Sequence, residues 1–144
     1  MKEPLIISVL EDYFRGKGYE TGTMIDCMNL VAVKDNEKWF IEAKGEWKLG
    51  MGYALYAAVG QIVRDMRSLG GGTRYAIAIA KEHFSYFRMW GVEGLKLLPI
   101  HLILIDESNN VEIKTPEEFV RLIEELKREE CNSLRDYVNK NGGE

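Results

Sequence analysis

The sequence predicts an α/β fold with a mixed central sheet flanked by helices. Three observations carry this prediction. Apolar residues recur at helical spacing near the start and again in the middle of the chain, two adjacent strand-like runs join through a short polar turn, and two runs of small and β-branched residues follow later. We expect the order helix, three strands, helix, strand, and then a C-terminal helix-strand-strand-helix extension.

The first half of the chain gives the clearer elements. An apolar stripe over 4–15 predicts a helix that begins at Pro4 and ends at the glycines after Arg15. Strands are expected over 19–25, 29–34 and 39–44, with a hairpin through the polar residues 35–38. A long helix is expected over 51–69, because three glycines follow it at 70–72.

The second half continues with buried strands. Residues 75–80 and 100–105 are apolar throughout apart from His101, which is typical of strands covered on both faces. A short helix over 84–90, a strand over 111–114 and a helix capped by Thr115 complete the order. The polar tail from Cys131 is expected to fray. We therefore expect one domain over 1–144, with a core at about 4–80, an extension at about 81–139 and a frayed end at 140–144.

Composition excludes several classes of protein. The 144 residues are 46% hydrophobic and 29% charged, no apolar run approaches the ~20 residues of a membrane span, and the first residues lack the pattern of a signal peptide. We expect a cytoplasmic protein with no membrane partner. Cys27 and Cys131 are too few and too far apart for a disulfide framework or a zinc site. The net charge of −4 argues against broad non-specific DNA binding, so any basic surface must be local.

The run from Trp39 to Gly45 is the most informative stretch. It is apolar and strand-like until it ends in Glu42, Ala43 and Lys44. Because strand side chains alternate between faces, Glu42 and Lys44 leave the sheet on the same side. A carboxylate and an ammonium placed together at a strand end suit a site where a divalent metal and a lysine act on a phosphodiester.

With these residues the chain resembles the PD-(D/E)xK nuclease superfamily, which includes many restriction endonucleases, archaeal Holliday-junction resolvases and RecB-type exonucleases. Glu42-Ala43-Lys44 is similar to the (D/E)-x-K motif on the third strand, Asp26 stands upstream as a first acid, and Gln61 follows in the next helix. The order of elements through Ala80 is also similar to the family core. The resemblance covers about half of the chain.

The resemblance implies a restriction endonuclease-like fold and a metal-dependent nuclease that hydrolyses phosphodiester bonds of DNA. It implies that Asp26, Glu42 and the backbone carbonyl of Ala43 bind Mg²⁺ or Mn²⁺, which prefer oxygen ligands. Lys44 is expected to assist the attacking water and stabilise charge in the transition state, and Gln61 to orient the water or a phosphate. Because one site cuts one strand, such proteins often act as a homodimer or within a larger complex.

The hairpin register decides which residue faces the motif. If the chain turns through Asn36 and Glu37, Lys44 pairs with Asn29, Glu42 pairs with Val31 and Trp39 pairs with Lys34. Asn29 then occupies the position of the first acid, where its neutral amide is a poor Mg²⁺ ligand. Asp26 replaces it only if the strand bends or bulges. On the first helix, Glu11 and Asp12 are the candidate acids; Glu11 lies nearly opposite the apolar stripe and Asp12 on its flank, so neither is assigned to the site.

Two other interpretations stay open. A catalytically decayed member of the same fold would act as a DNA- or protein-binding accessory factor in recombination, element excision or defence. A protein-interaction domain would have no nucleic-acid role. In the decayed member, the metal site would be lost at Asn29. Taken alone, Glu42 and Lys44 also fit an exposed ion pair on a strand that contributes about 0–1 kcal/mol, and Gln61 fits a residue packed on the sheet. A basic strip with aromatic neighbours is either a phosphate-binding surface or a solvated helix face; its members are Lys48, Arg64, Arg67, Arg74, Trp47 and Tyr53.

Overall fold

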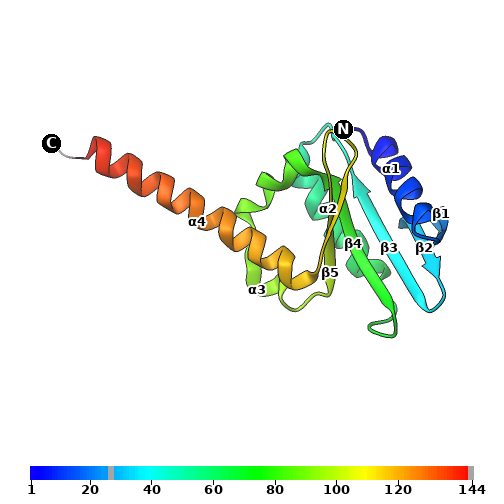
Figure 1. The fold of residues 1–144 in the computed structure, drawn as a ribbon. Helices are drawn as coiled ribbons and strands as arrows, with labels where there is room; N and C mark the ends of the chain where they lie inside the picture. The colour runs from blue at the N-terminus through cyan, green and yellow to red at the C-terminus, as the bar shows by residue number, and fades with distance from the viewer. Residues whose placement is uncertain (26–27, 143–144) are drawn as a thin grey trace.

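The computed structural model describes residues 1–25 and 28–142, and a six-stranded mixed sheet forms its centre (Figure 1). The strands lie in chain order: β1 (Glu20–Ile25), β2 (Met28–Lys34), β3 (Glu37–Lys44), β4 (Thr73–Ala80), β5 (Ile100–Ile105) and β6 (Val111–Lys114). The pairs β1–β2, β2–β3 and β5–β6 are antiparallel, whereas β3–β4 and β4–β5 are parallel. The predicted α/β class with a mixed sheet is confirmed.

Helices cover both faces of the sheet. They are α1 (Glu3–Gly16), α2 (Met51–Asp65), the 3₁₀ helix η1 (Lys81–Met89), α3 (Val92–Leu95) and α4 (Pro116–Asn141). On one face α1 buries Ile6, Leu10 and Phe14 against the sheet. On the other face the core includes apolar residues of α2, η1 and α4. Because α2 connects two parallel strands, it runs antiparallel to them.

Two helix ends differ from the sequence-based expectation. The helix α2 ends at Asp65 rather than at Leu69. Met66 leaves the helical conformation with φ −73° and ψ 104°, and beyond it the Tyr75 hydroxyl on β4 donates to the Ser68 carbonyl oxygen at 2.9 Å. At the other end of the molecule, α4 continues past Cys131 to Asn141, so the expected fraying from Cys131 is wrong.

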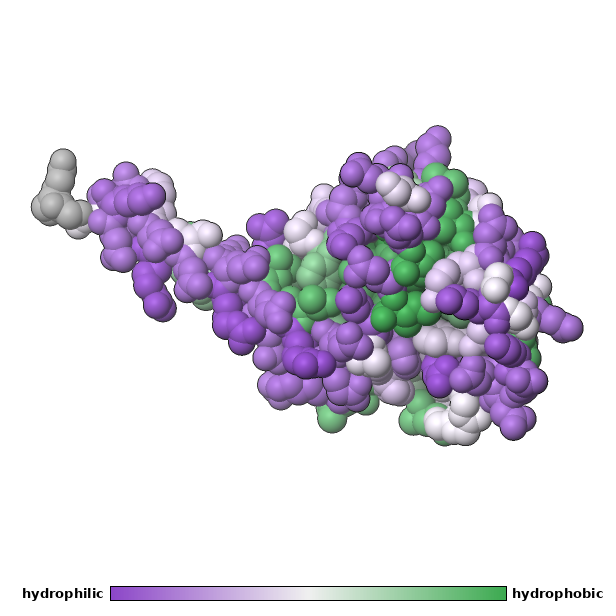
Figure 2. Space-filling model, in the orientation of Figure 1, coloured by the Kyte–Doolittle hydropathy of each residue, from purple (hydrophilic) through white to green (hydrophobic). Residues whose placement is uncertain are grey.

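The length of α4 follows from its sequence. No glycine or proline interrupts it between Pro116 and Gly142, and a capping box at Thr115 fixes its start. Its C-terminal half projects from the body of the molecule and carries mainly hydrophilic side chains (Figures 1 and 2). Across the described ranges, no helix has both the length and the apolar character required to cross a membrane.

Candidate functional site

Glu42 and Lys44 lie together at the carboxyl end of β3. The Lys44 Nζ is 3.3 Å from the Glu42 Oε1, as expected for residues two apart on a strand. Burial is the unexpected part, because Glu42 is only 1% exposed and the Lys44 side chain only 14%. The exposed ion pair of the alternative interpretation is therefore not what the structure contains.

The buried carboxylate of Glu42 is incompletely satisfied. Its Oε2 is buried and has no hydrogen-bond partner among residues 1–25 and 28–142. Burial raises the pKa of Glu42, and the positive charge of Lys44 offsets only part of this effect. A buried carboxylate oxygen without a donor costs free energy unless a cation or a water molecule approaches it.

The hairpin register differs by two residues from the one considered above. Lys34 pairs with Glu37 and Leu30 with Ile41, so the tight turn is Asp35-Asn36, and Asp35 adopts a positive φ of 53°. The expected pairs of Trp39 with Lys34, Glu42 with Val31 and Lys44 with Asn29 are wrong. In the observed register Asn29 comes level with Glu42.

Asn29 marks the point where β2 separates from β3. Its side-chain Oδ1, rather than a backbone carbonyl, accepts a hydrogen bond from the Ala43 backbone N–H at 2.9 Å. Because the N–H and C=O of one strand residue face the same neighbouring strand, the Ala43 carbonyl is also directed toward this opening. The carbonyl expected as a metal ligand therefore lies on the Asn29 side of β3.

Glu3, a residue that sequence reasoning missed, reaches the same place from α1. The Asn29 Nδ2 donates to the Glu3 Oε1 at 3.4 Å, and the negative charge of Glu3 contributes to the raised pKa of Glu42. The approach requires Gly45, because a Cβ there would overlap the backbone nitrogen of Glu3. Glu11, by contrast, pairs with Arg15 at 3.2 Å. The sequence signal for Glu3 was weak, since an acid in a first helical turn is usual.

Asp26 lies outside the described residues, and its role stays a prediction. The strand β1 ends at Ile25 and β2 begins at Met28. Within 1–25 and 28–142, no three His, Cys, Asp or Glu side chains form a group able to hold a metal ion. The described part of the site supplies two carboxylates, those of Glu3 and Glu42.

Gln61 lies on α2, and its buried side-chain Oε1 has no hydrogen-bond partner within the described part of the chain. Asp65, one turn later, lines the same depression as Phe40. The helix α2 runs antiparallel to β3. Gln61 precedes Asp65 by one helical turn of about 5.4 Å, so it lies closer than Asp65 to the carboxyl end of β3, where Glu42 is found. Gln61 therefore lies on the Glu42 side of Asp65, and the prediction that it acts opposite Lys44 remains untested.

Two arginines of the basic strip pair with acids of this chain. Arg74 pairs with Glu37 at 3.2 Å, and Arg64 pairs with its neighbour Asp65 at 2.7 Å. These arginines therefore have acidic partners within the chain.

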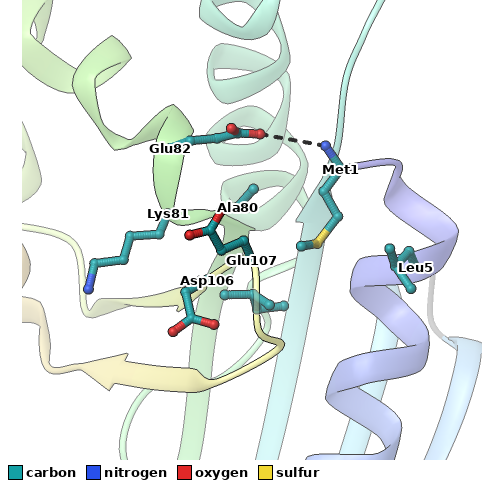
Figure 3. A pocket seen from close by; sticks show the side chains of 8 residues that line it. Met1, Leu5, Ala80, Lys81, Glu82, Asp106 and Glu107 are labelled. Carbon is teal, nitrogen blue, oxygen red and sulfur yellow. Dashed lines mark ion pairs between the residues drawn. The ribbon is translucent and has the colours of Figure 1, made fainter.

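A cavity of about 540 Å³ opens beside the candidate site, at the carboxyl ends of β4 and β5. In Figure 3, Met1 and Leu5 line one side, with Glu82, Asp106 and Glu107 around the rest. Neither Glu42 nor Lys44 lines this cavity. Both features nonetheless lie at the end of the sheet where open α/β folds bind their ligands.

Comparison with known proteins supports the fold. The sequence matches no protein-family model and no curated protein. The structure is similar to the crystal structure of an XisH family protein from Nostoc punctiforme PCC 73102, with a TM-score of 0.57 and 14% sequence identity. The match covers 76% of this chain and 98% of that one. At this identity the similarity concerns the fold.

Proposed function

We propose that the protein is a metal-dependent nuclease of the PD-(D/E)xK type, with a restriction endonuclease-like fold, that hydrolyses phosphodiester bonds of DNA. The observation that carries the proposal is the Glu42 carboxylate, buried beside Lys44 at a strand end with one oxygen unpartnered. Folding alone gives no reason for this arrangement, because burying an ion pair rarely adds stability.

The available donors fit a hard divalent cation. Glu42, Glu3 and the Ala43 carbonyl offer only oxygen atoms, which Mg²⁺ and Mn²⁺ prefer, and Asp26 is the remaining candidate ligand. When bound, such a metal polarises the scissile phosphate and lowers the pKa of the attacking water.

The protein groups have separable roles in this proposal. Glu42 holds the cation, while the Lys44 ammonium positions the attacking water and stabilises the negative charge that develops on the phosphate. Gln61, with a buried and unpartnered amide oxygen, accepts a hydrogen bond from that water. Asn29 orients the site by holding both Glu3 and the Ala43 N–H.

A second candidate function has an observation in its favour. Asn29 stands where a first strand acid is expected, and its amide is already engaged by protein groups. This arrangement favours a nuclease fold that has lost catalysis and serves as a DNA- or protein-binding accessory factor.

Two measurements separate the candidates. Calorimetric titration with Mn²⁺ should show binding that disappears in Glu42→Gln, and end-labelled single-stranded, duplex and branched DNA should be cut only when metal is present. Lys44→Met should abolish cleavage while Lys38→Met, an exposed lysine on the same strand, should not. Absence of Mn²⁺ binding by the unmodified protein supports the accessory-factor function instead.

A further inference from the structure

An exposed aromatic surface lies on the outer side of α2, on the same face of the sheet as the candidate site. It is formed by Tyr53, Tyr56 and Trp90, and we call it the tyrosine surface. Tyr53 is 63% and Tyr56 57% exposed. The Tyr56 ring stacks on Trp90 with centroids 5.5 Å apart and planes 20° apart, and Tyr53 meets Tyr56 edge-on at 6.4 Å.

The tyrosine surface is fixed to the core. Trp90 packs edge-on against Phe87 at 5.0 Å, Phe87 is fully buried, and Phe87 in turn packs against Phe119 of α4 at 5.0 Å. The exposed rings are therefore held in place before any ligand binds, which lowers the entropic cost of binding.

The charge around these rings is unusual for an acidic protein. The chain has 23 acidic and 19 basic residues, yet 47–64 contains no acid and two bases, Lys48 and Arg64. The neighbouring stretch 83–92, which carries Trp90, contains Arg88 and no acid. Acids do flank these stretches, but exposed Glu93 pairs with Lys96 at 2.9 Å. The two stretches that carry the rings therefore contribute positive charge only, which favours a phosphate backbone.

Two glycines leave the outer face of α2 open on both sides of Tyr56. Gly52 and Gly60 lie one turn before and after it, and a Cβ at either position would meet nothing within 4 Å. Glycine inside a helix costs about 0.5–1 kcal/mol relative to alanine. Among the described residues, no crowding requires these glycines, and they leave room for a ligand to approach the helix on either side of Tyr56.

We propose that the tyrosine surface binds a single-stranded stretch of nucleic acid by stacking on its bases. This proposal rests on the proposed nuclease function and assigns single-stranded nucleic acid as the substrate class of the nuclease. Flat exposed rings on stretches that carry basic residues but no acids suit nucleic-acid bases, since every base has a π-face. The loop 45–50 connects Lys44 directly to α2, so a strand held there passes next to the candidate site. A protein partner is the competing occupant, and the test distinguishes it.

Tryptophan fluorescence provides a direct readout without metal. Trp39 is buried, whereas Trp47 is 46% exposed and Trp90 lies within the tyrosine surface. In EDTA, oligothymidylate should quench the emission, and duplex DNA of equal length should quench it less. The variant Tyr53→Ala/Tyr56→Ala should bind roughly ten-fold more weakly for each lost ring. Tyr137→Ala, which removes a 67% exposed tyrosine from the projecting half of α4, is the matched control and should bind normally.

Gly60→Ala gives a second, independent test. It should raise thermal stability, because alanine favours the helix, and yet weaken oligonucleotide binding, because the methyl group blocks access to Tyr56. The proposal is overturned if oligothymidylate leaves the fluorescence unchanged, as expected of a protein interface, or if the tyrosine variant binds as tightly as the Tyr137→Ala control.

The two proposals fail in different ways. If oligothymidylate quenches the fluorescence and the quenching requires the tyrosines, but DNA is not cleaved in Mg²⁺ or Mn²⁺, the catalytic proposal is contradicted and the stacking proposal is supported. If Tyr53→Ala/Tyr56→Ala leaves cleavage unaffected, the stacking proposal is contradicted and the catalytic proposal is supported.

Discussion

The buried pair of Glu42 and Lys44 can be tested by a double-mutant cycle of stability. With 3.3 Å between Nζ and Oε1, the attraction is about 5 kcal/mol at an effective dielectric constant of 20. Removing both charges from water costs several kcal/mol per ion, so the pair adds little net stability. Breaking it is different, because the remaining charge stays buried and unpaired.

We therefore expect strongly unequal effects. Lys44→Met should lower the free energy of unfolding by about 3–5 kcal/mol, since it leaves the 1%-exposed Glu42 carboxylate without a cation. The double variant Glu42→Gln/Lys44→Met should be as stable as the unmodified protein or about 1–4 kcal/mol more stable. The coupling between the two positions is the quantity of interest.

Urea denaturation followed by circular dichroism at pH 7 measures all four corners of the cycle. The projecting half of α4 contributes helical signal of its own, so tryptophan fluorescence, to which the buried Trp39 contributes, serves as a second probe. A cost below about 1 kcal/mol for Lys44→Met would refute the reasoning, because exposed ion pairs have that magnitude.

Three further predictions use the same denaturation assay. Asn29→Asp should lower the free energy of unfolding by about 1–3 kcal/mol, because aspartate cannot donate to Glu3 and repels it, while Mn²⁺ binding measured by calorimetry should tighten. Since burial raises the pKa of Glu42 in the folded state, its protonation favours folding. The free energy of unfolding of the metal-free protein, relative to that of Glu42→Gln, should therefore be highest below the ordinary glutamate pKa. It should fall as the pH rises through the raised pKa of Glu42 in the folded state. A difference in free energy that does not change from pH 4 to 8 would contradict this. Thr115→Ala should cost about 1 kcal/mol by removing the capping bond from the Glu118 N–H, and an unchanged midpoint would argue against the cap.

Local pattern predicted the adjacency of Glu42 and Lys44, because the two-residue period of a strand determines it. It could not predict their burial. Burial follows from contacts between residues distant in sequence. At this strand end such contacts include the packing of the start of α1 on Gly45 and the hydrogen bond from the Ala43 N–H to Asn29. For the same reason Glu3 was missed, since nothing near it in the sequence indicates a strand end some 40 residues away.

The predicted hairpin register was wrong because the position of one turn was wrong. The sequence-based pairing placed the turn at Asn36 and Glu37, whereas the chain turns at Asp35 and Asn36. Aspartate and asparagine tolerate positive φ better than other non-glycine residues, and this preference was the available signal. The shift by two residues keeps every side chain on its expected face, so Asn29 still faces the motif although its partner changes.

The identity of residue 29 determines how the charges at this site balance. An aspartate there would place a third carboxylate beside Glu3 and Glu42, whereas the Asn29 amide donates to Glu3 and accepts from the Ala43 N–H at the same time. The neutral residue therefore allows α1 to bring its own acid to the strand end. In this arrangement the second described carboxylate comes from α1 rather than from β2, and the unpartnered Glu42 oxygen keeps the site open to a cation. If Glu3→Gln leaves Mn²⁺ binding intact while Glu42→Gln abolishes it, Asp26 is left as the remaining acid to complete the metal site.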